Sequence, residues 1–536
     1  MINFNPYYNP YPSRRSLVYA KNGMVSTSQP LAAHAGLEML QAGGNAIDAA
    51  LATAIALTVV EPTSNGIGSD AFALIWAGDK LHGLNASGPS PGSISIDKVA
   101  QKGHEKIPAW GWLPVTVPGA VAGWAAASDK FGRLPFPKLF EPAHRYAEQG
   151  YPLSPVLARN WARAYRIYSD NLKGEEFKEW FSTFAPGGRA PYPGEIWSSQ
   201  NMAETLGKIA ETQGKSFYQG SLAEKIIKAA QSHGGFLTEE DLKNYNAQWV
   251  QPLGMDYGRY RVWEIPPNGQ GLAALMALGI LKTLPGEDGP PEEFYHREIE
   301  ALKLGLTDGM AQITDPDAMK VSPEKLLSSE YLEERARLIG KRALTPGPGQ
   351  PPSGGTVYLA AADGEGNMVS FIQSNFMGFG SGVVVPGTGI SMQNRGFSFQ
   401  MDPEHPNALA GGKKTYHTII PGFLTRDDKG VGPFGVMGGY MQTQGHLQVI
   451  RKMIDQNLSP QAALDAPRWQ WIEGRKVAVE KSFPEHIASS LADRGHQIEV
   501  RLESGSFGRG QIILKERNGV LVGGTEPRTD SHIASF

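Results

Sequence analysis

The chain contains no cysteine among its 536 residues. A thiol nucleophile, a disulfide bond and a thiolate metal site are therefore all excluded. The chain also lacks a large excess of either charge, because its formal net charge at pH 7 is -3. Binding to nucleic acid requires a basic surface, so we expect no nucleic-acid partner. The remaining composition, with 41% hydrophobic and 19% charged residues, is typical of a globular protein.

Long hydrophobic runs are missing as well. The strongest run, residues 49–60, is too short to span a bilayer and directly follows Asp48. Residues 1–23 are polar, aromatic and proline-rich, and the pair Arg14 and Arg15 is not followed by the apolar stretch of a secretory signal. We therefore expect a cytoplasmic protein that has no membrane partner.

Patterns typical of metal sites are scarce too. The twelve histidines are scattered, with no pair three or four residues apart and no His-Glu-x-x-His sequence. The Gly-x-Ser-x-Gly sequence of many serine hydrolases is also missing. The sequence thus predicts neither a metal ion nor another cofactor.

A proline- and glycine-rich linker divides the sequence. Residues 345–355 hold four prolines and four glycines, and this composition forms neither helix nor strand. Before the linker, the first two thirds of the chain are expected to alternate between helices and strands. Within them, residues 43–62 carry small and apolar side chains on every face, which predicts a helix packed on both sides. After the linker, strand-rich segments are expected to continue to the C-terminus.

A β-hairpin is predicted directly after the linker. Two apolar strands, residues 356–362 and 368–374, are separated by a five-residue loop. Pairing the two strands from the loop outward places Thr356 opposite Ser374. Directly opposed side chains on one face of a sheet lie about 5 Å apart at Cβ. The hairpin therefore predicts that two hydroxyl groups meet at the strand ends.

Thr356 is a candidate nucleophile. A threonine hydroxyl needs a base beside it, and cleavage of the Gly355–Thr356 bond would supply one as the new α-amine, with a pKa of about 7.7–8.0. The same hydroxyl can perform the cleavage by attacking the Gly355 carbonyl, and glycine allows the strained backbone that this attack requires. Thr356 as an ordinary first residue of a strand is the alternative, and the local pattern alone favours that alternative.

Segments along nearly the whole chain resemble the γ-glutamyltranspeptidase family of N-terminal nucleophile hydrolases. Each segment is a weak signal alone, but their order and spacing together are hard to reach by chance. This resemblance favours Thr356 as the nucleophile. The matching segments are GGNAIDAA (43–50), GIGSDAFALIW (66–76), VPGAVAGW (117–124), FGRLPF (131–136), GGFLTEEDL (234–242), PPNGQGLAAL (266–275), DGEGNMVS (363–370), FGSGVVVPGTGI (379–390) and TEPR (525–528).

The resemblance implies an α+β fold, namely a four-layer α/β/β/α sandwich whose two central sheets interleave strands from both parts of the chain. It implies a zymogen that cleaves itself into a large subunit, residues 1–355, and a small subunit, residues 356–536, which together form one domain. Thr356 is then the nucleophile, with its own α-amine as the base. Ser374 takes the position of a supporting hydroxyl, which agrees with the hairpin register.

The substrate pocket departs from the family pattern. The arginine that usually clamps the substrate α-carboxylate is replaced here by Asn85. The aspartate that usually grips the substrate ammonium is replaced by Ser398. A pair of serines in the family's pocket corresponds to His417 and Thr418, and His417 is expected to shape the pocket or to form hydrogen bonds, not to act as a base.

The resemblance also indicates an oxyanion hole and a replacement anion holder. The family's glycine pair of the oxyanion hole falls near Met441 and Gln442, whose backbone N–H groups can serve whatever the side chains are. Arg395 is a candidate anion holder, because a guanidinium pairs with a carboxylate through two hydrogen bonds. A structural salt bridge to a nearby acid is the alternative for Arg395.

The sequence therefore predicts a self-processing, γ-glutamyltransferase-like amidohydrolase that cleaves small amides, such as γ-glutamyl compounds, through an acyl-Thr356 intermediate. One alternative is a dedicated amidase of the oxamate-amidohydrolase or cephalosporin-acylase type with little transfer to amines. Another is an unprocessed, non-enzymatic relative that binds a metabolite. The altered pocket favours amides that carry a carboxylate but no free α-ammonium. The sequence leaves open the exact amide, the acceptor of the acyl group, and whether copies assemble into a higher oligomer.

Overall fold

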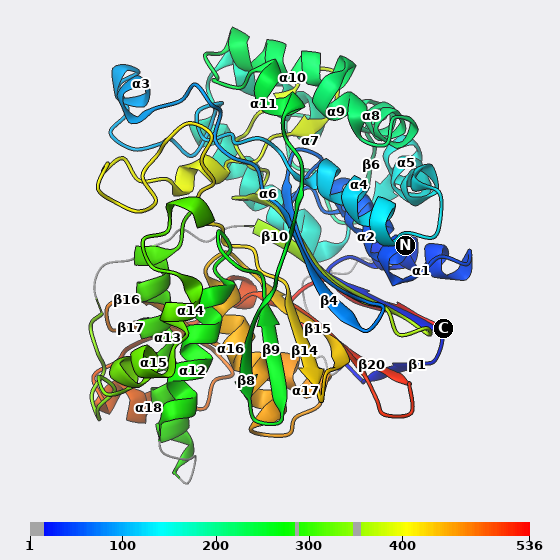
Figure 1. Ribbon diagram of the computed structural model, residues 1–536. Helices are drawn as coiled ribbons and strands as arrows, with labels where there is room; N and C mark the ends of the chain where they lie inside the picture. The colour runs from blue at the N-terminus through cyan, green and yellow to red at the C-terminus, as the bar shows by residue number, and fades with distance from the viewer. Residues whose placement is uncertain (1–14, 285–288, 347–354) are drawn as a thin grey trace.

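Two seven-stranded antiparallel sheets form the centre of the computed structural model, which describes residues 15–284, 289–346 and 355–536 (Figure 1). We call the first of them the hairpin sheet, because it contains the predicted hairpin. Its strands are, in spatial order, β21 (His532–Ser535), β2 (Gly23–Thr27), β10 (Gly355–Asp363), β11 (Met368–Phe376), β3 (Asp70–Ala77), β4 (Lys80–Ala86) and β7 (Gln248–Val250).

The second sheet packs against the hairpin sheet. Both sheets combine strands from before and after the proline-rich linker, as the resemblance implied. The two parts of the chain therefore cannot form separate sheets. The spatial order in the second sheet is β1 (Val18–Ala20), β20 (Leu521–Thr525), β19 (Arg509–Lys515), β15 (Lys429–Met437), β14 (Gly422–Arg426), β9 (Tyr260–Glu264) and β8 (Leu253–Tyr257).

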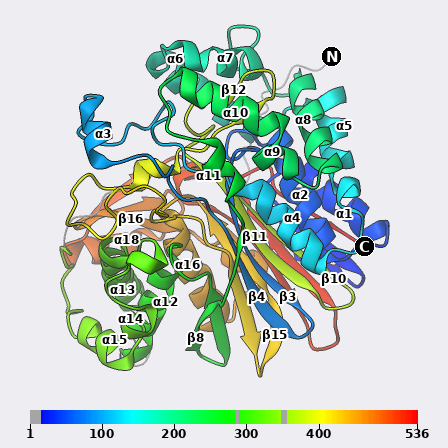
Figure 2. The ribbon, with the colours of Figure 1, turned by 45° about the horizontal axis from the view of Figure 1, so that its top comes forward.

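Helices cover the outer faces of both sheets and complete the predicted four layers (Figure 2). On the hairpin sheet they are α1 (Pro30–Gln41), α2 (Ala46–Val60) and α4 (Ala120–Phe131), with α5 (Glu141–Gln149), α6 (Pro155–Asn171), α7 (Lys178–Phe184), α8 (Gln200–Glu211), α9 (Lys215–Gln219), α10 (Ser221–Ser232) and α11 (Glu239–Lys243) beyond them. On the second sheet they are α12 (Gly271–Thr283), α13 (Pro291–Gln312), α14 (Pro323–Leu326), α15 (Ser329–Ala336), α16 (Met441–Ile454), α17 (Pro460–Asp465) and α18 (Glu485–Asp493).

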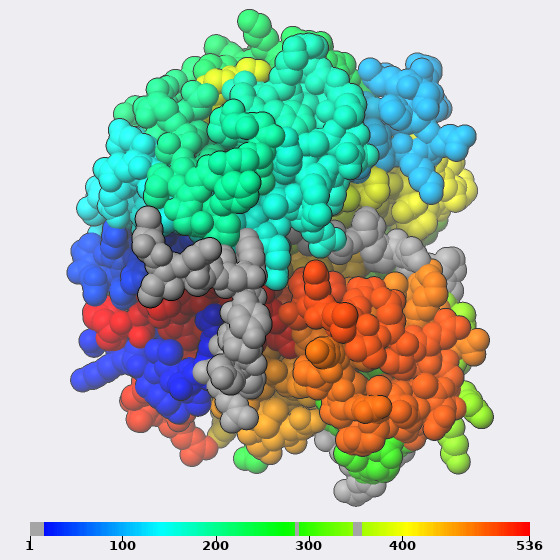
Figure 3. Space-filling model, turned by 180° about the vertical axis from the view of Figure 1, so that it is seen from behind, coloured from blue at the N-terminus to red at the C-terminus, as the bar shows by residue number. Residues whose placement is uncertain are grey.

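The alternation of helices and strands that we expected over the first two thirds of the chain is wrong for residues 96–243. Between α3 (Ile96–Gln101) and α11 this region is helical apart from two two-residue strands, β5 (Tyr151–Pro152) and β6 (Ile196–Trp197). Apart from α3, its helices bury their apolar faces in one cluster with α2 and do not each cover a strand. From behind, these helices (cyan and green) form the upper half of the surface, and C-terminal segments (orange and red) form much of the lower half (Figure 3).

The C-terminal part is also more helical than expected, since α16, α17 and α18 interrupt its strands. Besides the sheet that pairs β5 with β6, two small sheets lie outside the central pair. One joins β12 (Val384–Val385) to β13 (Ile390–Ser391), and the other contains β16 (Trp469–Glu473), β17 (Lys476–Glu480) and β18 (Gln497–Arg501). Among the described residues, no helix is both long and apolar enough to cross a membrane.

The helix predicted over residues 43–62 is α2, and all fifteen of its residues are buried. Asn45 caps its first turn, and Asp48 returns a hydrogen bond to the Asn45 backbone in a capping box. The helix lies on the outer face of β10 and β11. A helix without a solvent-facing side suits this place, because further helices cover it from outside.

Alternation along β10 sorts its side chains between the two faces of the hairpin sheet. Val357, Leu359 and Ala361 belong to the core beneath the helices, whereas Tyr358 and Ala360 belong to the core between the two sheets. This period of two follows from the pleat of a strand. The even-numbered positions of β10 therefore face the second sheet.

One carboxylate fixes the turn of the hairpin to α2. Asp363 accepts hydrogen bonds from the backbone N–H groups of Glu365 and Asn367, both at 3.0 Å. Its other oxygen accepts from the N–H of Ala46, in the first turn of α2, at 2.9 Å. Asp363 thus joins the hairpin loop to the N-terminus of the buried helix, where a negative charge is favoured.

Replacing Asp363 with alanine should lower the apparent thermal midpoint by about 2–4 °C, because hydrogen bonds to a charged group are each worth about 1.5–3 kcal/mol and the chain is long. Scanning calorimetry measures this shift. Glu365→Ala in the same loop is the control, since that side chain is exposed and forms a surface ion pair with the exposed Arg133. Equal midpoints for the two variants would contradict the role given to Asp363.

Candidate functional site

Thr356 and Ser374 lie in contact at the open end of the hairpin. The Thr356 hydroxyl donates a hydrogen bond to Ser374 Oγ at 3.1 Å, and Thr356 is 1% exposed. The amide Nε2 of Gln442 lies 3.5 Å from Thr356 Oγ1 on its other side. The structure therefore brings together the two hydroxyl residues that the hairpin predicted.

The register of the hairpin explains how they meet. From Ala362 opposite Met368 to Val357 opposite Gln373, the pairing follows the predicted register. It then shifts by one residue, and Gly355 lies opposite Phe376. An irregularity of this kind turns a side chain away from the regular pleat, and such features are frequent beside active sites. Thr356 lies at that irregularity.

The backbone around Ser374 is strained. Phe376 has a φ of 76°, in the left-handed region that a bulky side chain rarely adopts. Its backbone N–H donates to Ser374 Oγ at 2.8 Å and so helps to fix the serine hydroxyl. Strained residues of this kind cluster at functional sites, where the surrounding fold supports them.

A buried aspartate, Asp70, lies next to Ser374 in the sheet and forms a row with Ser374 and Thr356. Asp70 on β3 is the direct cross-strand partner of Ser374, so Thr356, Ser374 and Asp70 follow one another across three adjacent strands. Asp70 Oδ2 lies 3.1 Å from His417 Nε2, and Asp70 Oδ1 accepts from the N–H of Gly119 at 3.3 Å. Burial raises the pKa of Asp70 to about 7, although the charge of a nearby arginine opposes that shift.

Sequence reasoning missed Asp70. The available signal was the position of this carboxylate, directly before the apolar run 71–76. His417, which the sequence assigned to the pocket, lies against Asp70. Burial lowers the pKa of His417 far below its ordinary value, so the ring is neutral and is not a cation that pairs with Asp70.

Arg395 is buried close to this row. It begins a short 3-10 turn, Arg395–Ser398, and is 1% exposed. Its Nη1 donates to Thr418 Oγ1 at 2.8 Å, and its guanidinium lies 4.2 Å from the centre of the Phe376 ring. Its Nε and Nη2 are buried without a hydrogen-bond partner in the described residues. Burial lowers the pKa of Arg395 to about 10, so the group remains a cation at neutral pH.

The alternative interpretation of Arg395 as a structural salt bridge is wrong. Within residues 15–284, 289–346 and 355–536, no carboxylate forms an ion pair with it. A buried cation without a direct partner is costly, and the charge of Asp70 compensates Arg395 only from beyond contact distance. Two unused donors on such a cation are typical of a site that receives an anion.

The two positions at which the family clamp is altered behave differently. The side-chain amide of Asn85 is already hydrogen-bonded within the protein. Its Nδ2 donates to Asn268 Oδ1 at 3.0 Å, and its Oδ1 accepts from the N–H of Ser87 at 3.0 Å. The buried hydroxyl oxygen of Ser398 has no hydrogen-bond partner in the described residues. Ser398 can therefore bond to a ligand, whereas Asn85 would first have to break existing bonds.

Met441 and Gln442 begin α16. Their backbone N–H groups donate to the carbonyls of Gly438 and Gly439, each at 3.1 Å. An oxyanion role for these N–H groups stays a prediction, and it requires both bonds to open when a substrate binds. The Gln442 side chain is already in place, since its Oε1 accepts from the N–H of Ile420 at 2.9 Å while its Nε2 points to Thr356. No local pattern in the sequence indicated this side-chain contact.

A group of possible metal ligands lies elsewhere. His296, Glu300 and His496 place one ligand atom each within 4.8 Å of one another. His496 lies 200 residues from His296 along the sequence, and this separation hid the grouping. Lys303 Nζ lies 2.7 Å from Glu300 Oε1, and the N–H of Leu344 donates to the other oxygen at 2.8 Å. The carboxylate thus already has a cation beside it, and the cluster ties the segment before the linker to α13.

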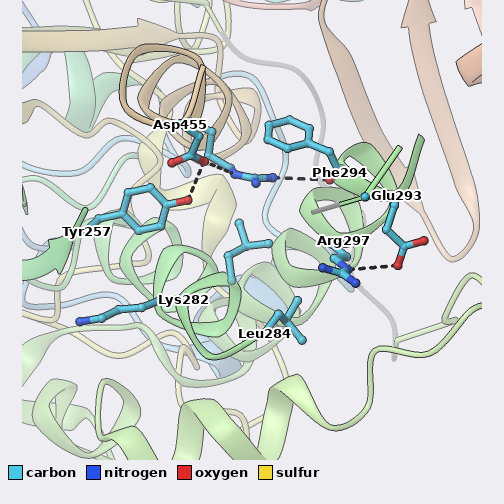
Figure 4. A pocket seen from close by; sticks show the side chains of 10 residues that line it. Tyr257, Lys282, Leu284, Glu293, Phe294, Arg297 and Asp455 are labelled. Atoms are coloured by element: carbon cyan, nitrogen blue, oxygen red, sulfur yellow. Dashed lines mark hydrogen bonds and ion pairs between the residues drawn. The ribbon is translucent and has the colours of Figure 1, made fainter. Parts of the chain in front are cut away.

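A separate cavity of about 220 Å³ opens among the helices outside the second sheet (Figure 4). Apart from Lys282, its charged groups are paired with one another. Asp455 binds Tyr257 at 2.7 Å and Arg451 at 2.8 Å, and Arg297 binds Glu293 at 3.1 Å. Its lining includes none of the residues that the sequence analysis selected. The chemistry-bearing residues therefore concentrate at the hairpin and not in this cavity.

Two sheets between helical layers, with a hydroxyl residue at the start of a central strand, define an N-terminal nucleophile hydrolase. The sequence model described as Gamma-glutamyltranspeptidase matches residues 32–536. The chain therefore belongs to the γ-glutamyltranspeptidase family, as the sequence resemblance indicated, and it is an enzyme.

Similar proteins have related names. The chain is 35% identical to the glutathione hydrolase-like YwrD proenzyme of Bacillus subtilis, over 95% of this chain and 97% of that protein. It is 34% identical to the oxamate amidohydrolase proenzyme of Klebsiella pneumoniae, over 96% and 98%. The crystal structure of cephalosporin acylase from Bacillus halodurans matches with a TM-score of 0.97 and 59% identity, over 100% of this chain and 99% of that one.

Ser374→Ala should slow both chain cleavage and amide turnover by about 10²–10³-fold, the usual effect of removing one preorganised hydrogen-bonding group. The matched control is Ser370→Ala, because Ser370 lies on the same strand and its hydroxyl contacts Tyr358 at 2.8 Å. The rate of fragment appearance on denaturing gels and the steady-state kcat test both effects. Equal rates for the two variants would show that Ser374 does not assist Thr356.

Proposed function

We propose that the protein is a self-processing, γ-glutamyltransferase-like amidohydrolase that cleaves small amides through an acyl ester on Thr356. The observation that carries this proposal is the 3.1 Å hydrogen bond from the buried Thr356 hydroxyl to Ser374. Thr356 directly follows Gly355, the residue before the proposed cleavage. The names of the similar proteins support it, since they include glutathione hydrolase, oxamate amidohydrolase and acylase proenzymes.

Processing begins with the same hydroxyl. Thr356 Oγ1 attacks the carbonyl carbon of Gly355, the C–N bond breaks, and the proton lost by the hydroxyl goes to the nitrogen, which becomes the α-amine. Water then hydrolyses the resulting ester and releases a large subunit, 1–355, and a small subunit, 356–536. Ser374 accepts the hydrogen bond of the attacking hydroxyl, and Gln442 lies on its other side.

Turnover repeats this chemistry on a substrate. The free α-amine, with an ordinary pKa near working pH, takes the proton of the Thr356 hydroxyl as it attacks the amide carbonyl. The amine product leaves, and Thr356 carries the acyl group. Water completes hydrolysis, and an amine acceptor would instead complete a transfer. A dedicated acylase with little transfer remains the second candidate, favoured by the likeness to cephalosporin acylase.

Arg395 favours acyl groups that end in a carboxylate. Its Nε and Nη2 are buried donors on a cation, and Ser398 offers a hydroxyl nearby in the same 3-10 turn. Neither Ser398 nor Asn85 carries the charge needed for an amino-acid clamp. The proposed substrates are therefore amides whose acyl part bears a carboxylate without a free α-ammonium. A cytoplasmic location stays a prediction from the sequence, which leaves assembly beyond the two subunits open.

Purified protein should separate into two fragments, the smaller beginning Thr-Val-Tyr-Leu. Thr356→Ala removes the attacking oxygen and should remain one inactive chain, whereas Thr356→Ser keeps a hydroxyl and should still be cleaved. Denaturing gels and N-terminal sequencing of the smaller fragment measure the outcome. Cleavage of the alanine variant at the same bond, or an active uncleaved chain, would contradict the proposal.

Substrate preference can be tested with three anilides that share a leaving group. Glutaryl p-nitroanilide has a carboxylate, pentanoyl p-nitroanilide has a methyl group in its place, and γ-glutamyl p-nitroanilide adds an α-ammonium. The glutaryl compound should have the highest kcat/KM. Arg395→Gln should raise its KM by about 30–1000-fold, the effect of leaving a desolvated charge unpaired, with little change for the pentanoyl compound. A large preference for the γ-glutamyl compound would contradict the proposed pocket.

A further inference from the structure

Two opposite charges are buried beside Thr356, yet they do not touch each other. Asp70 is fully buried and Arg395 is 1% exposed. Asp70 contacts His417 at 3.1 Å, and Arg395 donates to the next residue, Thr418, at 2.8 Å. The consecutive residues His417 and Thr418 therefore hold the Asp70 carboxylate and the Arg395 guanidinium apart at the end of the hairpin.

Each of the two charges needs the other while the site is empty. A buried charge without compensation costs several kcal/mol, and oppositely charged groups in a protein interior attract beyond contact distance. The attraction of Arg395 opposes the burial effect on the pKa of Asp70, and Asp70 likewise supports the cation of Arg395. Because they do not pair directly, two donors of Arg395 remain unused.

A substrate carboxylate that binds Arg395 changes this balance. The site would then hold two carboxylates against the single guanidinium of Arg395, with the ammonium of Lys414 as a further charged neighbour of Asp70. The incoming anion takes over the compensation of Arg395, and it repels the negative charge of Asp70. Like charges held close together in a buried site disfavour the ionised form of one of them. Asp70 is the group that can relieve the repulsion, by taking a proton from solvent.

We propose that Asp70 is the internal counter-ion of Arg395 in the empty site and is released from this role by protonation when an anionic acyl group binds. Asp70 is thus a specificity-determining residue that couples recognition of the substrate carboxylate to uptake of one proton. This inference rests on the proposed function, because it takes Arg395 as the holder of the substrate carboxylate. It gives Asp70, a buried acid in the pocket, a role other than binding a substrate ammonium.

The groups around Asp70 allow this assignment. His417 is neutral, since burial lowers its pKa far below the ordinary value. Tyr218 and Tyr245 are neutral too, because burial raises the pKa of both phenols far above 10. Lys414 is the remaining charged neighbour, and burial lowers its pKa to about 8. Its Nζ donates to a glutamine side chain at 2.7 Å, so its titration must be separated from that of Asp70 by a variant.

The test compares kcat/KM for glutaryl and pentanoyl p-nitroanilide between about pH 6 and about pH 9 on the processed enzyme. Their ratio cancels the ionisation of the Thr356 α-amine, which both substrates require. In the wild-type enzyme the ratio should fall above about pH 7 by up to about tenfold per pH unit, because binding of the anion requires a proton.

In Asp70→Asn, which keeps the shape and removes the charge, the ratio should no longer fall near pH 7. Two matched controls isolate this effect. Asp48→Asn removes a buried carboxylate at the opposite end of the hairpin, beside the α2 N-terminus, and should keep the wild-type profile. Lys414→Gln removes the other titrating neighbour, whose pKa is about 8, and should keep the fall that begins near pH 7.

A second measurement uses the wild-type enzyme alone, so it does not depend on the folding of a variant. Calorimetric titration with glutarate at about pH 7.5, in two buffers of different ionisation enthalpy, should show net proton uptake on binding. A wild-type ratio that is flat with pH, or glutarate binding without proton uptake, would overturn the inference.

Hydrolysis of the γ-glutamyl compound tests whether Asp70 instead binds the substrate ammonium. If Asp70→Asn lowers kcat/KM for γ-glutamyl p-nitroanilide selectively, Asp70 binds the substrate ammonium and the inference is wrong. Failure of the proposed function looks different, because none of the three anilides would then be hydrolysed in a Thr356-dependent way. An enzyme that hydrolyses them with a retained pH dependence in Asp70→Asn refutes the inference and leaves the proposed function intact.

Discussion

The hydrogen bond between Thr356 and Ser374 is the contact on which the rest of the site depends. It forms where the regular pairing of β10 and β11 shifts by one residue, so the fold presents the threonine at the end of a rigid strand. A hydroxyl is a weak nucleophile unless its partners are fixed in advance. The backbone N–H of Phe376 and the amide of Gln442 provide that fixation from two other directions.

The interleaved sheets hold this contact in place. β10 and β11 are central strands of the hairpin sheet, between β2 on one side and β3 on the other. Cleavage after Gly355 would free the end of β10 without separating the two parts of the chain, because both central sheets contain strands from each part. The same arrangement places Asp70 beside Ser374, so the nucleophile and the buried charges lie together at the open end of the hairpin.

Local features were predictable from the sequence, and long-range ones were not. The register that pairs Thr356 with Ser374 followed from a short loop and the two-residue period of strands, which are local constraints. The position of Asp70 depends on β3 joining β11 across about three hundred residues of chain, and no local pattern encodes that neighbour. The pairing state of Arg395 likewise depends on segments distant in sequence. Its residue type suggested an anion site, but only its unused donors distinguish that site from a salt bridge.

The central claim is that the hydroxyl of Thr356 carries the acyl group during turnover. Acid quenching of the processed enzyme during hydrolysis of glutaryl p-nitroanilide, followed by peptide mapping with mass spectrometry, tests it directly. The account predicts a mass increase equal to one glutaryl group, as an ester on the peptide that begins Thr-Val-Tyr-Leu. An adduct on another residue, or turnover with no covalent adduct under conditions in which deacylation is rate-limiting, would contradict it.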